Sequence, residues 1–252
     1  MNRSILFPLP DRDFDVTEVA VPWKLLTRAG HRVVFATETG AVPACDPFLL
    51  RGVLFGQLGA DREAKALYRE LERDPSFRAP LPWSELDPSA FDALMLAGGH
   101  APGMRQYLGN EPLRRMIREF WALDRPVAAI CHGVLVLARA GLLNGRRTTC
   151  LPKYLERVAY YLTAWKLGRY YRTYDAYVED EVIASGARFE RGPITLFQRG
   201  SDADDRGTFL VEDQKYLSAR WPGDAYRIAR ALLVKLEHEP VHAARQPSIV
   251  AD

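Results

Sequence analysis

Residues 128–138, AAICHGVLVLA, form an apolar run that is interrupted only by Cys131, His132 and Gly133. The residues before Cys131 are typical of a buried strand and those after Gly133 of a buried helix. In an open parallel sheet, such a strand-to-helix junction lies at the carboxyl edge, where ligands bind. We therefore expect the Cys131 side chain to project into solvent from a sharp turn of the nucleophile-elbow type.

Outward from this junction, apolar strands alternate with amphipathic helices. Strands are predicted at 5–7, 32–37, 93–97 and 126–130, helices at 17–29, 112–123, 133–140 and 225–237, and a hairpin turning near Asp213. Near-continuous apolar strands that alternate with helices indicate a parallel sheet covered on both faces. The sequence therefore predicts an α/β fold.

The chain is interpreted as one domain over residues 1–240 with two insertions. A helical insertion spans about 47–90 and is expected near the mouth of the site, and an aromatic-rich insertion spans about 151–207. The aromatic residues indicate either packing or an oligomer interface. Residues 241–252 have little to bury, so a mobile tail is expected there.

The amino-acid composition limits the classes of binding partner and the cellular compartment that we expect for this chain. The 34 basic and 32 acidic side chains leave a net charge of +2, which predicts neither a nucleic-acid nor a membrane partner. No apolar segment reaches the length of a membrane span. Three cysteines are too few, and odd in number, for a disulfide framework, so a reducing, cytoplasmic location is expected.

Cys131 is the candidate nucleophile. A thiol at the start of a helix has its pKa lowered by the helix dipole, so we expect a thiolate near neutral pH. A buried, inert cysteine is the alternative. His132 can act as general acid or base, and Gly98 and Gly99, which follow another apolar strand, either supply oxyanion donors or only satisfy a tight turn.

Glu18 lies near the start of the first predicted helix, so its carboxylate is also expected at the carboxyl edge of the sheet. It is a candidate proton carrier beside the thiol, although an acidic residue at a helix N-terminus has a simpler explanation in the helix dipole. No metal site is predicted, since His31 and His100 lie far apart without ligand spacing. Zinc held by His100 with Glu18 is the one combination left open.

Four features together resemble the ThiJ/PfpI superfamily, which has the flavodoxin-like, class I glutamine-amidotransferase-like fold. They are the AxCHG elbow, the GGH turn at 98–100, the glutamate of the first helix, and the closing SARWPGD. The resemblance implies Cys131 as nucleophile, Glu18 as its carboxylate neighbour, and Gly99 with the His132 backbone as oxyanion donors. His100, in the same turn, is a candidate substrate-binding residue.

The resemblance also implies a third, histidine-orienting acid, for which Glu156 is the first candidate and Asp224 the second. The late His-x-Glu pair of glutamine amidotransferases is absent. The implied activity is a cofactor-independent, glyoxalase-like conversion of a small 2-oxoaldehyde to a 2-hydroxy acid. Alternatives are an amidase or peptidase, an isonitrile hydratase, and a redox sensor or chaperone. Relatives commonly form dimers, so a homodimer with a small-molecule substrate is expected.

Overall fold

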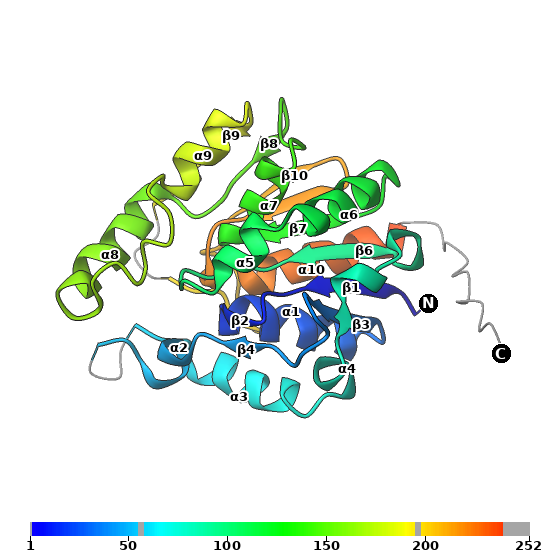
Figure 1. Cartoon of the computed structure of the whole chain (residues 1–252), viewed down its shortest axis with the longest axis horizontal. Helices are drawn as coiled ribbons and strands as arrows, with labels where there is room; N and C mark the ends of the chain where they lie inside the picture. The colour runs from blue at the N-terminus through cyan, green and yellow to red at the C-terminus, as the bar shows by residue number, and fades with distance from the viewer. Residues whose placement is uncertain (1, 55–57, 195–197, 239–252) are drawn as a thin grey trace.

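A twisted seven-stranded sheet forms the centre of the molecule (Figure 1). The computed structural model describes residues 2–54, 58–194 and 198–238. Within these residues the strand order is β10-β11-β7-β6-β1-β3-β5, and only β10 pairs antiparallel to its neighbour. The prediction of an α/β fold with a mostly parallel sheet is confirmed.

The strands of the main sheet are β1 (Ser4–Pro8), β3 (Arg32–Thr37), β5 (Leu81–Pro82), β6 (Ala93–Leu96), β7 (Val127–Ile130), β10 (Leu210–Asp213) and β11 (Tyr216–Ala219). Two short pairs lie outside it, β2 (Arg12–Phe14) with β4 (Ala44–Cys45) and β8 (Arg147–Thr148) with β9 (Arg188–Phe189).

The α-helices are α1 (Val16–Arg28), α2 (Pro47–Arg51), α3 (Arg62–Leu71), α4 (Pro75–Arg78), α5 (Met104–Gly109), α6 (Glu111–Ala122), α7 (Val134–Arg139), α8 (Lys153–Leu167), α9 (Val178–Ala184) and α10 (Ala225–His238). Short 3₁₀ turns occupy η1 (Trp83–Glu85), η2 (Pro88–Ala90), η3 (Cys131–Gly133) and η4 (Pro222–Asp224).

Helices cover both faces of the sheet. Helices α1 and α10 pack against each other and against sheet strands, and α3 packs on the outside of α1. Figure 1 shows α5, α6 and α7 on the opposite side of the sheet. Every residue of β6 and β7 is buried between these layers, which explains why their sequences are apolar without alternation.

The hairpin predicted near Asp213 is β10–β11, which turns at Gln214 with a φ of 59°. Asn and Gly favour this left-handed region, so Gln214 is an uncommon residue there. Strand β11 then pairs in parallel with β7, directly beside the strand that leads into Cys131. The C-terminal hairpin therefore supports the strand that carries the candidate nucleophile. The predicted mobile tail lies outside the described residues.

The segment at 47–90 contributes more to the core than an insertion at the mouth would. Strand β5 extends the main sheet at its edge, and Tyr68, Leu71 and Phe77 are buried in the central core. Phe77 makes edge-to-face contacts with Phe14 and Phe35. Among the described residues of this segment, Leu49, Val53 and Leu58 line the cavity described below.

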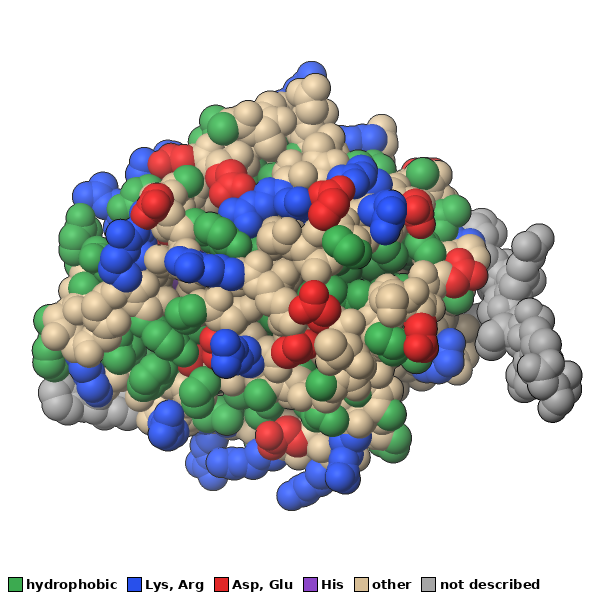
Figure 2. All heavy atoms as spheres, in the orientation of Figure 1, with side chains coloured by type: hydrophobic (Ala, Val, Ile, Leu, Met, Phe, Trp, Pro, Cys, Tyr) green, Lys and Arg blue, Asp and Glu red, His purple; other side chains and the backbone are tan. Residues whose placement is uncertain are grey.

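The segment at 151–207 carries α8 and α9, which Figure 1 shows extending to one side of the sheet. Tyr161 and Trp165 of α8 are 63% and 69% exposed, so core packing does not explain these two aromatic residues. Figure 2 shows hydrophobic side chains gathered on that side, whereas charges of both signs are mixed over the rest of this face. Among the described helices, none combines the length and apolar character that crossing a membrane requires.

Candidate active site

Cys131 stands at the tip of a strained elbow. It is the first residue of η3, directly after β7. Its φ of 58° lies in the left-handed region, which residues with a side chain seldom occupy. The turn is tight enough that a Cβ added to Gly133 would lie 2.3 Å from the backbone oxygen of Leu96. A glycine is therefore required where the elbow crosses β6, and the predicted nucleophile-elbow geometry is present.

His132 lies next to the thiol. Its Nδ1 is 3.6 Å from Sγ of Cys131, within hydrogen-bond range for sulfur. Both side chains are enclosed, with Cys131 1% and His132 3% exposed. The prediction that Cys131 projects into solvent is therefore wrong, because residues distant in sequence cover the edge of the sheet at this point.

The expected thiolate at neutral pH is also wrong for the site as it stands. Burial raises the pKa of Cys131 well above its usual value, and the neighbouring Glu18 and Asp15 carboxyls raise it further. The backbone N–H of His132 acts in the opposite direction but lowers this pKa less. The resting group is therefore a thiol, and a base must remove its proton when it attacks a substrate.

Glu18 is fully buried in the first turn of α1. Its Oε2 accepts a hydrogen bond of 2.7 Å from the backbone N–H of Gly98. Burial raises the pKa of Glu18 well above its usual value, and the charge of Asp15 raises it further. The raised pKa makes the Glu18 carboxyl suited to accept and return a proton beside Cys131.

Asp15 fixes the position of Glu18 by capping α1. Its Oδ1 accepts hydrogen bonds from the backbone N–H of Thr17 at 2.8 Å and of Glu18 at 3.1 Å. This residue was not among the predicted site residues, although an aspartate directly before an amphipathic helix is a recognisable N-cap signal.

The glycine turn after β6 closes the site from the other side. A Cβ on Gly98 would lie 2.7 Å from the His132 nitrogen, 2.9 Å from Glu18 Oε2 and 3.0 Å from the Cys131 Cβ. Because the Gly98 N–H already donates to Glu18, it is not a free oxyanion donor. Gly99 packs against the backbone oxygen of Asp13, so its tight turn has a structural reason as well.

His100 lies over His132, with ring centroids 4.7 Å apart in an edge-to-face arrangement. Burial lowers the pKa of His132 well below its usual value and lowers the pKa of His100 to about 4. Both imidazoles are therefore neutral near pH 7, so the unprotonated form of His132 is present beside the thiol.

A segment far along the chain covers this pair of histidines. The ring of Tyr171 packs edge-on against His100 at 5.7 Å, and the hydroxyl of Thr173 donates to the His100 carbonyl. Tyr171 is held in turn by Asp46, whose Oδ2 accepts from its hydroxyl at 3.1 Å. We call the residues around Tyr171 and Thr173 the cap. No local sequence signal marks it, because it depends on long-range contacts.

A cavity of about 140 Å³ leads to the site from the surface. His100 and Asp15 form part of its wall, so it ends beside the enclosed Cys131–His132 pair. The rest of the lining is mostly apolar and comes from both long segments, including Leu49, Val53, Leu155, Val158, Leu162 and Tyr171. Both long segments therefore contribute side chains to the lining of the cavity.

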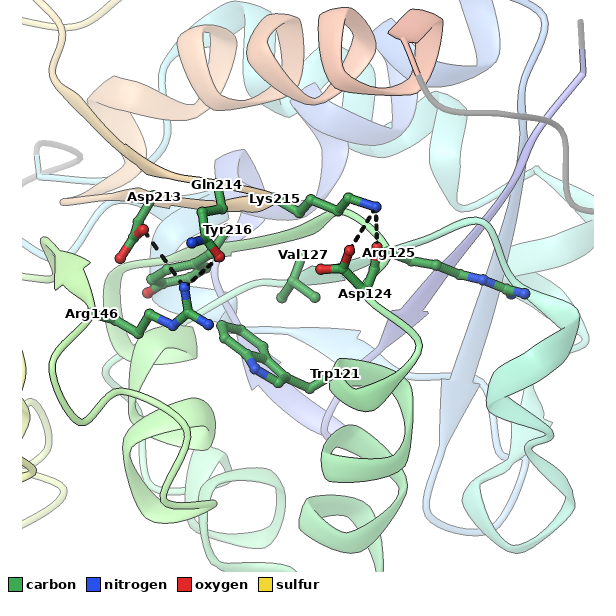
Figure 3. A pocket seen from close by; sticks show the side chains of 9 residues that line it. All are labelled: Trp121, Asp124, Arg125, Val127, Arg146, Asp213, Gln214, Lys215 and Tyr216. Atoms are coloured by element: carbon green, nitrogen blue, oxygen red, sulfur yellow. Dashed lines mark hydrogen bonds and ion pairs between the residues drawn. The ribbon is translucent and has the colours of Figure 1, made fainter.

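A smaller hollow of about 30 Å³ lies at the amino end of β7, opposite the end that carries Cys131 (Figure 3). Four of its charged residues form two ion pairs: Arg146 pairs with Asp213 at 3.7 Å and Lys215 with Asp124 at 3.1 Å. It holds none of the predicted site residues, so we assign the candidate site to the carboxyl end.

Comparison with known proteins shows the family to which the chain belongs. A family model described as ThiJ/PfpI family-like matches residues 9–204. The chain belongs to this ThiJ/PfpI-like family. A protein of Pyrococcus abyssi named a deglycase is 31% identical over 224 residues, which are 89% of this chain and 94% of that protein.

Two further members of the comparison are similar over different lengths. Protein/nucleic acid deglycase 2 of Escherichia coli is 41% identical over 152 residues, 60% of this chain and 72% of that protein. The crystal structure of glyoxalase III from Candida albicans shares the fold, with a TM-score of 0.68 at 18% identity. That match covers 92% of this chain and 97% of the other.

The third acid expected from the ThiJ/PfpI resemblance is not brought to His132. Glu156 accepts from Arg172 at 3.0 Å and from the Val178 N–H at 3.0 Å. Asp224 forms a fully buried ion pair with Arg220 at 2.8 Å. Within the described part of the chain neither carboxylate hydrogen-bonds to His132. Both carboxylates therefore have structural roles: Glu156 holds the cap, and Asp224 holds the C-terminal turn.

Proposed function

We propose that this chain is a cysteine-dependent, cofactor-independent enzyme that acts on small carbonyl compounds and converts a 2-oxoaldehyde to a 2-hydroxy acid. The observation that carries the proposal is the strained Cys131 elbow with His132 Nδ1 at 3.6 Å and the buried Glu18 carboxyl beside it. A nucleophile, a neutral base and a proton-holding acid are the groups that this reaction needs.

The reaction begins when Sγ of Cys131 adds to the aldehyde carbon. His132 accepts the thiol proton, and the aldehyde oxygen takes up a proton to give a hemithioacetal. The backbone N–H groups of Gly99 and His132 are the proposed donors to the developing oxyanion. Because both histidines are neutral near pH 7, the base form of His132 is available without a change of pH.

The second step moves hydrogen between the two carbons. Glu18 or His132, in its unprotonated form, removes the proton from the former aldehyde carbon and returns one to the neighbouring keto carbon. The hydroxyl proton of the hemithioacetal passes to the former keto oxygen, which leaves a thioester on Cys131 and a hydroxyl on the next carbon. Water then cleaves the thioester, releasing the 2-hydroxy acid and the thiol. The net reaction is addition of one water to the 2-oxoaldehyde, so no external oxidant or reductant is consumed.

A deglycase-type hydrolysis is the second candidate. It is favoured by the Pyrococcus abyssi relative, which bears that name and aligns over 94% of its length. The mostly apolar cavity beside His100 is also larger than a three-carbon aldehyde needs, so it can accept the remainder of a bigger adduct. The first step, addition of Sγ to a carbonyl carbon, is the same.

A redox sensor built on Cys131 fits the site less well. Thiols that react rapidly with peroxide are exposed and have a lowered pKa. Cys131 is 1% exposed, and burial raises its pKa. These properties favour a thiol that is activated only by a substrate in the cavity.

The test is turnover of methylglyoxal without glutathione, following both substrate loss and lactate formation. We expect lactate from the wild type and none from Cys131→Ala. The matched control is Cys45→Ala, another buried free cysteine, which should retain turnover. A wild-type protein that forms no lactate, or a Cys131→Ala variant that still forms it, would refute the glyoxalase proposal.

A further inference from the structure

Three ligand-type side chains converge beside the cavity, and one of them, His100, lines it. The side chains of His100, Cys131 and His132 each offer one ligand atom, and these atoms lie within 4.8 Å of one another. They come from two turns, the glycine turn after β6 and the elbow after β7, whose parent strands are neighbours in the sheet. The sheet topology therefore fixes two of the ligands rigidly and brings the third over them.

From this cluster we infer that His100, Cys131 and His132 form a site for a thiophilic divalent cation such as Zn²⁺. The bound cation would inhibit the enzyme, because it occupies the nucleophile. Two imidazoles and a thiolate are a donor set that suits zinc, with the fourth position open toward the cavity. The sequence spacing did not predict such a site, because only the fold brings His100 to the cysteine.

The distances fit a tetrahedral ion with little movement. Zn–S of about 2.3 Å and Zn–N of about 2.0–2.1 Å place S and N about 3.6 Å apart across a tetrahedral angle. The observed separation of Cys131 Sγ and His132 Nδ1 is 3.6 Å. His100 lies in a loop and would have to approach by no more than about 1.5 Å to complete the set.

His100 has a nitrogen that the fold leaves without a partner. Its Nε2 is buried and makes no hydrogen bond, whereas buried polar atoms are normally satisfied. The backbone of the same residue is held by Thr173, so its ring stays over the elbow. A metal ion bound by Nε2 would explain why this nitrogen is buried without a hydrogen-bond partner.

Binding would convert the thiol to a thiolate ligand. One Zn–S bond forms, one S–H bond breaks, and the proton passes to the buffer, so no redox partner is required. Neutral imidazoles bind without losing a proton. Because the ion occupies the lone pair that attacks the carbonyl carbon, turnover should stop while the ion is bound. This inhibitory consequence rests on the proposed function, whereas the site itself does not.

The direct test is titration of the full chain with Co²⁺ under a phosphine reductant. We expect one equivalent to bind with a thiolate-to-cobalt charge-transfer band, and Zn²⁺ to displace it. Cys131→Ser should abolish the band, and His100→Gln should weaken binding by at least about tenfold, the smallest loss usual even for outer-shell changes. The matched control is His238→Gln at the exposed end of α10, which should bind as the wild type does.

The possible outcomes distinguish the inferred metal site from the proposed enzymatic activity. Lactate formation in the presence of a chelator, with no cobalt band, would overturn the metal site and leave the proposed function intact. A cobalt band that needs Cys131 and His100, in a protein that forms no lactate, would support the metal site and overturn the proposed function. A band unaffected by His100→Gln would also overturn the inferred ligand set, and circular dichroism checks that each variant is folded.

Discussion

The elbow and the cap make one site but are held by different forces. The elbow is formed by backbone: two fully buried parallel strands, a cysteine at a φ of 58° and a glycine pressed against the Leu96 carbonyl. The cap is formed by side chains from distant segments, in which Asp46 holds Tyr171 and Tyr171 covers His100. The elbow therefore positions the chemistry, and the cap determines its access and its dielectric environment.

The first prediction tests how rigid the elbow is. Gly133→Ala places a Cβ 2.3 Å from the Leu96 oxygen and 2.8 Å from the Ala97 oxygen, and both are backbone atoms that cannot rotate away. We expect a loss of about 3 kcal/mol or more in the free energy of unfolding, measured by urea denaturation. Gly109→Ala is the matched control, since nothing lies within 4 Å of its added Cβ. Equal stability of the two variants would show that the elbow can relax.

The second prediction concerns the acid of the elbow. Glu18→Gln keeps an oxygen for the Gly98 N–H but cannot hold or return a proton, so we expect kcat/KM for the 2-oxoaldehyde to fall at least about a hundredfold. The free energy of unfolding should change far less. Glu119→Gln on the exposed face of α6 serves as control. A Glu18→Gln variant with full activity would remove Glu18 from the mechanism.

The third prediction concerns the cap and the pH dependence of the free energy of unfolding. Burial raises the pKa of Asp46 to about 6, so the folded state binds more protons than the unfolded chain between pH 3.8 and 6. The wild type should therefore lose about 2 kcal/mol relative to Asp46→Asn as the pH rises from 4 to 7. Urea denaturation of both proteins at the two pH values measures this difference. A pH-independent difference would mean that the carboxyl is not buried against Tyr171 in solution.

The contrast between elbow and cap also explains which features the sequence could predict. Local patterns predict the strands, the helix starts and the junction at Cys131. Strands that are buried on both faces of a parallel sheet need continuous apolar runs, and these runs are visible in the sequence. The β10–β11 hairpin and the glycine turn at 98–100 were also predictable, because polar or glycine residues between apolar runs indicate turns.

The predictions that failed all depend on contacts between distant segments. The thiol of Cys131 was expected to be exposed and acidic, but it is 1% exposed, because Gly98 and Glu18 from distant segments pack around it. Its pKa is consequently raised by burial rather than lowered by the short helix that follows. The roles assigned to Glu156 and Asp224 failed similarly, since Arg172 and Arg220 engage them. Spacing alone gives no information on such pairings.

The last and smallest effect is expected on the outer face of α8, which lies beyond the cap. Trp165 is 69% exposed, and its indole N–H donates to the Leu162 carbonyl of the same helix. Because the ring buries little in the single chain, Trp165→Ser should change the free energy of unfolding by less than about 0.5 kcal/mol. Leu155→Ser, on the buried side of the same helix, is the contrasting variant and should cost several times more. Urea titrations at low and high protein concentration measure both. A concentration-dependent loss for Trp165→Ser alone would show that a second copy of the chain covers this face, since only association makes unfolding depend on concentration.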